Sequence, residues 1–240
     1  MSVVFFASCE DTENILNELD LNKPLTSIDV SDGLKEALTV GSKNASDILA
    51  LEDGFYKNEL IKIMLPKEAQ VITENLKYVP GGQGLVDKVI LNLNRAAEDA
   101  VKGAAPIFAS AITEMSITDA FNILNGDKDA ATNYLKEKTY DQLALLFNPI
   151  VKTSLDKDLI AGMSTNESWK SLTIPYNEVA ETLAGTLLGL ETVNTNLDEY
   201  VTNKALDALF VKVAQEEELI RTDPLKRVND ILKRVFGSLD

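Results

Sequence analysis

Four residues at helical spacing form the first group in this sequence that could carry chemistry. Leu91, Asn94, Arg95 and Glu98 stand at positions i, i+3, i+4 and i+7, so on a helix they share one face. The leucine predicts that this face is covered, and a covered guanidinium needs a carboxylate, which Glu98 supplies. Asn94, Arg95 and Glu98 are therefore candidate ligand-binding residues for an anionic ligand. The alternative is a structural ion pair or an ordinary solvated helix face.

A second group alternates as the start of a calcium-binding loop does, with Asn125, Asp127 and Asp129 at every other position. The sixth position of that loop holds Ala130 where glycine is needed, and the twelfth holds Lys136 where glutamate is needed. Asp127 and Asp129 are thus candidate metal ligands for Ca²⁺, and turn formation and helix capping are the alternative. We predict no cofactor other than this calcium ion.

A third group is the acidic run Glu216-Glu217-Glu218, which is followed by Arg221. On a helix this spacing indicates a face with one i,i+3 ion pair.

The absence of histidine removes several classes of catalysis. The chain has no histidine and one cysteine, and histidine is both the usual acid–base side chain near neutral pH and the commonest metal ligand. Ser-His-Asp and Cys-His catalysis are therefore excluded within one chain, as are zinc sites built on histidine or several cysteines. Catalysis by carboxylates, or by a serine with a lysine, stays open.

The charge balance narrows the choice of partners. The chain carries 38 acidic and 23 basic residues, for a formal net charge of −15. Such a field repels phosphate backbones, so we expect no nucleic acid among the partners. It also argues against adhesion of the folded surface to anionic lipid, while it is compatible with divalent cations and basic partners.

The sole cysteine lies in a sequence that resembles the end of a bacterial lipoprotein signal peptide. An apolar run ends in two small residues, Ala7 and Ser8, directly before Cys9, and the chain turns acidic after it. We predict that Cys9 is lipidated and that several acyl chains on it anchor the protein in a membrane. No lysine or arginine precedes Cys9, so we expect the signal peptide to be truncated in this sequence. The alternative is a frayed terminus with a chance cysteine.

The composition and periodicity predict an all-α protein. Aromatic residues make up only 6% of the chain, and apolar residues recur with a period near 3.6. We expect a single multi-helix domain of about ten helices, several of them short, over residues 28–240. Residues 1–27 would form a flexible tether that carries Cys9.

Individual helix boundaries follow from capping and breaking residues. Ser31 is predicted to cap a helix over 31–51, and Ser116 a short helix that ends in a left-handed cap at 125–126. The apolar stretch 55–65 is read as a packed loop or one short strand. The stretch 162–175 is predicted to be a loop, and 197–221 a long helix.

A series of short motifs runs through most of the chain. In order they are NRAAE at 94–98, PIF at 106–108, ILNGD at 123–127, AATNYL at 130–135, YVT at 200–202, KALD at 204–207 and DP at 223–224. Together they resemble one family of bacterial envelope proteins, catalogued as domain of unknown function forty-one ninety-seven, over roughly residues 31–238. Members of that family typically carry a secretion signal, which agrees with the interpretation of Cys9, but the resemblance implies a fold and a location rather than a reaction.

These observations lead us to expect a non-enzymatic envelope lipoprotein that acts by binding. It would be lipid-anchored through Cys9 on the periplasmic side of the outer membrane or at the cell surface. Its partner could be a protein, an apolar small molecule or a divalent ion. One alternative is a carboxylate-based hydrolase, with or without Ca²⁺ or Mg²⁺, and another is a structural or assembly component of the envelope.

Overall fold

The computed structural model describes residues 25–69, 73–74, 78, 80–160 and 162–237. The described residues are almost entirely helical, which confirms the predicted all-α class, and their only strands are the short antiparallel pair β1 (Asp158–Ile160) and β2 (Met163–Ser164). The α-helices are α2 (Ser27–Leu49), α4 (Gly82–Val101), α5 (Ala104–Glu114), α6 (Ile117–Leu124), α7 (Ala130–Leu155), α8 (Thr165–Ala180), α9 (Leu183–Leu187), α10 (Leu197–Thr222) and α11 (Asp230–Gly237), with the 3-10 helices η1 (Lys67–Ala69) and η2 (Pro224–Lys226).

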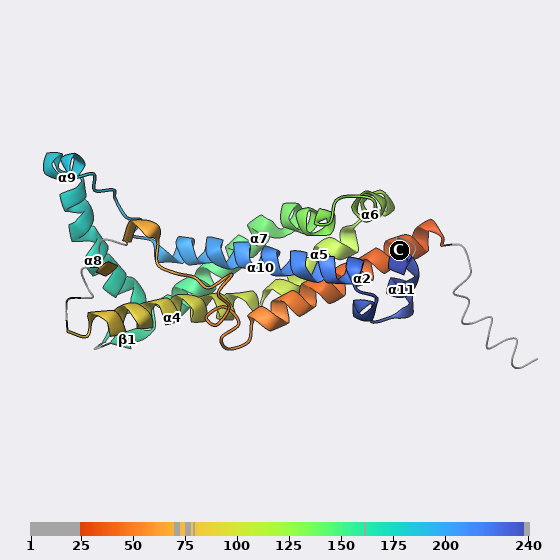
Figure 1. Ribbon diagram of the computed structural model, residues 1–240, viewed down its shortest axis with the longest axis horizontal. Coiled ribbons are helices and arrows are strands. Elements are labelled where there is room, and N and C mark those ends of the chain that lie inside the picture. Colours follow the sequence, from red (N-terminus) through yellow and green to blue (C-terminus); the bar gives the residue numbers. More distant parts are fainter. Residues whose placement is uncertain (1–24, 70–72, 75–77, 79, 161, 238–240) are drawn as a thin grey trace, which may run out of the picture.

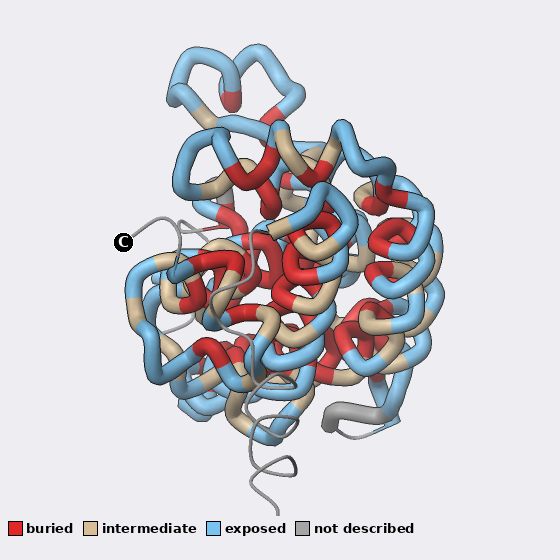
Figure 2. The backbone as a smooth tube through the Cα atoms, turned by 90° about the vertical axis from the view of Figure 1, so that its right-hand side faces the viewer, coloured by how far each residue is buried: buried red, intermediate tan, exposed pale blue. Residues whose placement is uncertain are grey.

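The long helices lie side by side and give the molecule an elongated shape (Figure 1). Helix α10 packs against α7, α2 and α4, and α7 also packs against α4 and α5. Helix α2 contacts α5, α6 and α11. Seen along the bundle, the buried residues face inward and the exposed ones form the outer skin (Figure 2). One apolar interior therefore joins segments from both ends of the sequence.

Large apolar side chains fill this interior. Phe108 and Phe210 meet edge to face with ring centroids 5.9 Å apart, and Tyr140 stacks on Phe210 at 6.3 Å. Phe147 is completely buried on α7. Because burying one such side chain contributes about 1.5–3 kcal/mol, the apolar stripes of α7 and α10 supply much of the driving force for the bundle.

Capping boxes set the starts of three helices. The Oγ of Ser116 accepts a hydrogen bond from the N–H of Asp119, as predicted for α6. Helix α2, by contrast, begins at Ser27 because Thr26 and Asp29 form the same reciprocal pair. The prediction that Ser31 caps this helix is wrong, since Ser31 is buried inside it.

The predicted loop over 162–175 is also wrong. Ser164 and Glu167 form a third capping box, which starts α8, and this helix continues through Pro175 to Ala180. The capping hydrogen bonds and the burial of Trp169 stabilise a helix that one internal proline does not break. For the stretch 55–65 the sequence allows either a packed loop or one short strand. The structure shows a loop of turns and irregular backbone that packs on α4.

The two ends of the molecule differ. Helices α8 and α9 project from one end, whereas the start of α2, together with α6 and α11, lies at the other (Figure 1). No helix among the described residues is both long enough and apolar enough to cross a membrane. Cys9 and most of the predicted tether lie outside the described residues.

Candidate functional site

The predicted ligand-binding residues of α4 face the turns that follow α2. Arg95 donates from Nη1 to Glu98 Oε2 at 2.6 Å and from Nη2 to Asp53 Oδ1 at 2.7 Å. The side chain of Glu98 is only 4% exposed, and its Oε1 accepts a hydrogen bond from the backbone N–H of Phe55 at 3.2 Å. The guanidinium and the buried carboxylate therefore tie the turn at Asp53 and Phe55 to α4.

Asn94 completes this arrangement one residue before the arginine. It is fully buried, and its Oδ1 accepts from the N–H of Ile63 at 2.8 Å. Its Nδ2 donates to the carbonyls of Ile63 at 2.8 Å and Ile90 at 2.7 Å. An unpaired buried amide would cost free energy, so these bonds fix Ile63 against α4. We call Asn94, Arg95 and Glu98 the loop clamp, because all three hold segment 50–66.

The charges of the loop clamp are compensated within the chain. A hydrogen bond from Lys57 lowers the pKa of Asp53 below its ordinary value of 3.8, and Arg95 adds to that effect against the opposing influence of burial. Burial alone would lower the pKa of Arg95, but hydrogen bonds to Glu98 and Asp53 outweigh it, so its pKa is raised. Arg95 already contacts three carboxylates when Glu52 is included. Binding of an external anion by this arginine stays a prediction.

The segment that the loop clamp holds forms one wall of a groove of about 470 Å³, and α10 forms the other wall. Among the described residues, three lysines line it, Lys62 from the segment, Lys67 from η1 directly after it and Lys204 from α10, together with a single carboxylate, Asp207. The hydroxyl of Tyr200 donates to the carbonyl of Met64 at 2.8 Å and fastens the two walls to each other. We call this feature the lysine groove.

Apolar surface lies beside these cations. Met64 is 51% exposed and Val211 is 46% exposed, although both are apolar residues of the groove walls. The Nζ of Lys62 lies 4.4 Å from the ring centroid of Tyr56, which holds one cation next to an aromatic surface. The lysine groove thus combines positive charge with apolar walls in a chain of strongly negative net charge.

Sequence reasoning did not find the lysine groove. One signal was available, because residues 57–67 hold Lys57, Lys62 and Lys67 against the single acidic residue Glu59. The third groove lysine, Lys204, stands far along the chain and is brought to the site only by the packing of α10. The same reasoning did place Asn94, Arg95 and Glu98 on one helix face, but it predicted an anionic ligand or a structural ion pair there and not their contacts with segment 50–66.

The predicted calcium ligands lie in the turn between α6 and α7. Asp127 is exposed, and Asp129 is the N-cap residue of α7 without a hydrogen bond from its side chain. Among the residues described, no group of three or more His, Cys, Asp or Glu is placed to hold a metal ion. The structure thus brings no third acidic ligand to Asp127 and Asp129.

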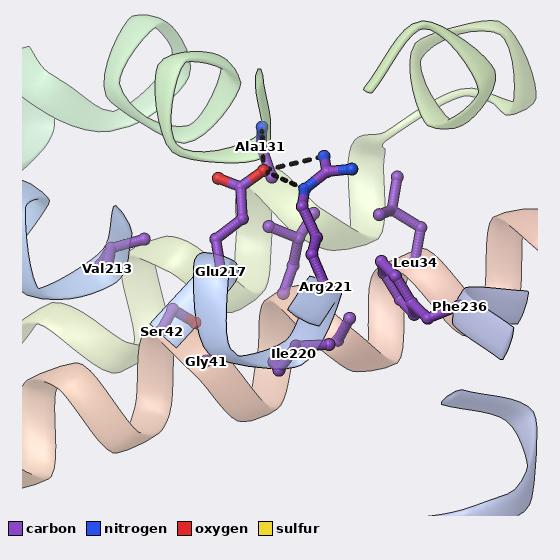
Figure 3. Close-up of a pocket in the computed structure, with 11 residues that line it drawn as sticks. Leu34, Gly41, Ser42, Ala131, Val213, Glu217, Ile220, Arg221 and Phe236 are labelled. Atoms are coloured by element: carbon purple, nitrogen blue, oxygen red, sulfur yellow. Dashed lines mark hydrogen bonds and ion pairs between the residues drawn. The ribbon is translucent and has the colours of Figure 1, made fainter. Parts of the chain in front are cut away.

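A glutamate from α10 does the capping that was predicted for these aspartates (Figure 3). Glu217 accepts hydrogen bonds from the N–H groups of Ala131 at 3.1 Å and Thr132 at 2.8 Å, at the start of α7. Arg221 donates to Glu217 Oε1 at 2.8 Å and to the carbonyl of Ile123 at 2.9 Å, at the end of α6. The Glu217 carboxylate therefore lies at the positive end of the α7 dipole, and the Arg221 guanidinium lies at the negative end of the α6 dipole.

This junction corrects two predictions. The ion pair of Arg221 is an i,i+4 pair with Glu217, and both side chains are largely buried. The end of α6 has no left-handed cap, since Asn125 has φ −91° and Arg221 takes the terminal carbonyls instead. The adjoining apolar cavity measures about 20 Å³, room for about one water molecule, so the geometry indicates a structural junction.

The helical bundle with its short capped helices thus defines an all-α protein with a lysine groove on its surface. The chain belongs to the family described as protein of unknown function (DUF4197), whose model matches residues 24–237, nearly the whole chain. This confirms the resemblance seen in the sequence. Neither the curated proteins nor the solved structures contain a match to the chain.

Proposed function

We propose that this protein is a non-enzymatic binding protein of the bacterial envelope that takes an anionic, partly apolar small molecule into the lysine groove. The observation that carries the proposal is the meeting of Lys62, Lys67 and Lys204 around one groove in a chain of net charge −15. Charges of one sign that gather in a cleft against the overall field raise the local concentration of ligands of the opposite sign.

The composition of the groove favours a ligand with two parts. Lysine ammonium groups attract a carboxylate, sulfate or phosphate as point charges. Met64, Val211 and Ala208 offer apolar contact a short distance away, in a volume within the usual range for small-molecule pockets. A fatty acid or a similar anionic amphiphile matches both features.

The alternative functions find less support at this site. Among the described residues, Asp207 is the only carboxylate that lines the groove, whereas glycoside hydrolysis, for example, uses two carboxylates that flank the scissile bond. The buried Glu98 and Glu217 each accept backbone hydrogen bonds and pair with an arginine. These carboxylates therefore have structural partners already, and no specific observation favours the hydrolase or the divalent-ion reading.

Isothermal titration with dodecanoate tests the proposal, with dodecylamine and dodecanol as cationic and neutral counterparts. We expect saturable binding of dodecanoate alone, and a loss of at least tenfold in affinity for Lys67→Glu/Lys204→Glu. Each exposed ion contact is worth about 0.2–1 kcal/mol, and reversal of charge turns attraction into repulsion. Lys128→Glu, which changes the charge of an exposed lysine far from the groove, should leave affinity within about twofold of the parent. Equal binding of the three ligands would contradict the proposal.

The envelope location is a proposal that depends on Cys9. Acyl chains on this cysteine would anchor the protein to a membrane, with the helical domain on the periplasmic side of the outer membrane or at the cell surface. Fractionation of cells that express the chain behind a complete lipoprotein signal peptide tests it. The parent should sediment with membranes and Cys9→Ser should be released, whereas continued membrane association of the variant would count against lipidation.

A further inference from the structure

Helix α9 lies at the projecting end of the molecule (Figure 1), and leucines in and directly after it are exposed. Leu183 and Leu187 are each 79% exposed, and Leu188 is 76% exposed. The first two stand four residues apart, so they share one face of the helix. We call these three residues the leucine tip.

Helix α9 is nevertheless a defined piece of structure. Its N-cap Thr182 accepts a hydrogen bond on Oγ1 from the N–H of Gly185 at 3.0 Å. At the other end, the N–H of Leu190 donates to the carbonyl of Gly185 at 3.0 Å and that of Gly189 to Thr186 at 3.1 Å. With Gly189 at φ +69°, these bonds form a Schellman motif. A five-residue helix is not stable on its own, so these caps hold it.

The corner between α8 and α9 is tightly packed. A Cβ atom on Gly185 would lie 2.3 Å from the carbonyl oxygen of Val179, so only glycine fits there. The segment that returns from α9 is fastened to α8, because Asn177 exchanges two hydrogen bonds of 2.8 Å with the backbone of Val193. Trp169 adds a hydrogen bond of 3.0 Å to the carbonyl of Asn194. These contacts therefore hold α9, and with it the leucine tip, in a fixed position relative to α8.

The three leucines contribute little to the fold that presents them. Full burial of one leucine would contribute about 1.5–3 kcal/mol, and these side chains leave most of that surface in water. Val179 and Ile174 on the neighbouring helix α8 are also apolar and exposed, at 55% and 48%. Large apolar side chains that stay exposed on a projecting element are candidates for an interaction site.

The charges around the leucine tip select the chemistry of its partner. No lysine or arginine occurs between Lys170 and Lys204, and Glu178, Glu181 and Glu191 are exposed beside α9. We propose that the leucine tip docks against an apolar surface of a partner protein, such as one face of an amphipathic helix, that is flanked by lysine or arginine side chains. Two copies that met tip to tip would bring the same glutamates together, and an anionic bilayer would repel them. The lysine groove is a separate surface, so the two proposals can fail independently.

The probe for this proposal is a labelled amphipathic helical peptide of leucine and lysine, about 14 residues long, and its counterpart has glutamate in place of lysine. At about 0.15 M salt, we expect the parent protein to bind the Leu/Lys peptide saturably and the Leu/Glu peptide at least tenfold more weakly. The variant Leu183→Ser/Leu187→Ser/Leu188→Ser should lose at least tenfold in affinity for the Leu/Lys peptide.

Matched controls separate docking from general attraction to an acidic protein. Leu51, Leu145 and Leu225 are 64%, 77% and 89% exposed outside the tip, so changing these three to serine should leave binding within about twofold of the parent. Glu178→Gln/Glu181→Gln should weaken binding about threefold, because it removes two rim charges. The unfolding temperature of the tip variant should stay within about 2 °C of that of the parent. If the triple substitution destabilises the fold more than this, the peptide-binding measurement is repeated with Leu187→Ser alone.

Four results would overturn the proposal. The tip variant could bind the Leu/Lys peptide as tightly as the parent, or the parent could fail to bind it. Vesicles of phosphatidylglycerol and phosphatidylethanolamine could retain the parent and release the tip variant, which would make the occupant a membrane. Analytical ultracentrifugation could instead show dimers that the tip variant abolishes, which would make the occupant a second copy.

Discussion

At the scale of single residues, Glu217 and Arg221 show how two charges can be buried in this bundle. The two side chains form an ion pair with each other. Glu217 also accepts hydrogen bonds from free N–H groups at the start of α7, and Arg221 donates to free carbonyl groups at the end of α6. The desolvation of both ions is therefore offset by charge-assisted hydrogen bonds. This explains why the turn between α6 and α7 needs neither a left-handed cap nor a capping aspartate.

Replacement of this glutamate should be costly. Glu217→Gln should lower the free energy of unfolding by about 3 kcal/mol, because it leaves Arg221 as a buried charge whose carboxylate partner is gone. Urea denaturation measures the loss. The neighbouring Glu218 is exposed, so Glu218→Gln should change stability by about 0.5 kcal/mol or less. Equal effects of the two substitutions would show that the junction does not stabilise the fold.

The loop clamp gives a pH-dependent prediction. The hydrogen bond from Lys57, aided by Arg95, lowers the pKa of Asp53 relative to the unfolded chain, so the ionised form favours the folded state. Its contribution is present above the ordinary pKa of 3.8 and is lost as the pH falls through the lower, folded-state pKa. Urea denaturation across this acid range should show a smaller loss of stability with falling pH in Asp53→Asn than in the parent. An unchanged slope would contradict the assignment.

At the scale of elements, the starts of α2, α6 and α8 are set by capping boxes, and these boundaries can be predicted only where the capping box is recognised in the sequence. Ser116 correctly predicts the start of α6. Thr26 and Ser164 form the same capping box at the starts of α2 and α8, where we instead predict a cap at Ser31 and a loop from the sequence. In each case the residue three positions on is acidic, which is the mark of a capping box. The predicted loop over 162–175 also ended at a proline, but Pro175 lies inside α8.

Two helical glycines provide a matched test of helix packing. A Cβ atom on Gly33 of α2 would lie 2.5 Å from Val235 Cγ2 of α11, whereas one on Gly84 of α4 would meet nothing within 4 Å. Gly33→Ala should destabilise the protein by about 1–3 kcal/mol through overpacking. Gly84→Ala should stabilise it by up to about 1 kcal/mol through helix propensity. Thermal unfolding measures both, and a gain for Gly33→Ala would show that α11 does not pack closely on α2.

The candidate site was predictable only in part, for a physical reason. Asn94, Arg95 and Glu98 stand close together in one helix, so the sequence places them on one face and correctly suggested a covered ion pair. Their partners, the backbone groups of Phe55 and Ile63, carry no signature in the sequence because every residue except proline has a backbone N–H. The lysine groove depends on long-range packing and could not be assembled from local patterns.

At the scale of the whole molecule, the elongated bundle separates three surfaces. The start of α2, which follows the predicted tether, lies at one end, and the leucine tip projects from the other (Figure 1). The lysine groove lies along α10, against the segment that the loop clamp holds. An anchored protein of this shape could hold a small ligand in the groove while the far end engages a partner.

The most direct test of the lysine groove is a crystal structure of the protein grown with 12-bromododecanoate. We expect the carboxylate among Lys62, Lys67 and Lys204, and an anomalous bromine peak beside Met64 and Val211 in the groove between segment 60–67 and α10. The same peak should be missing from crystals of Lys67→Glu/Lys204→Glu. An ordered bromine atom that lies only at other surfaces, or an empty groove at saturating ligand, would contradict the proposed function.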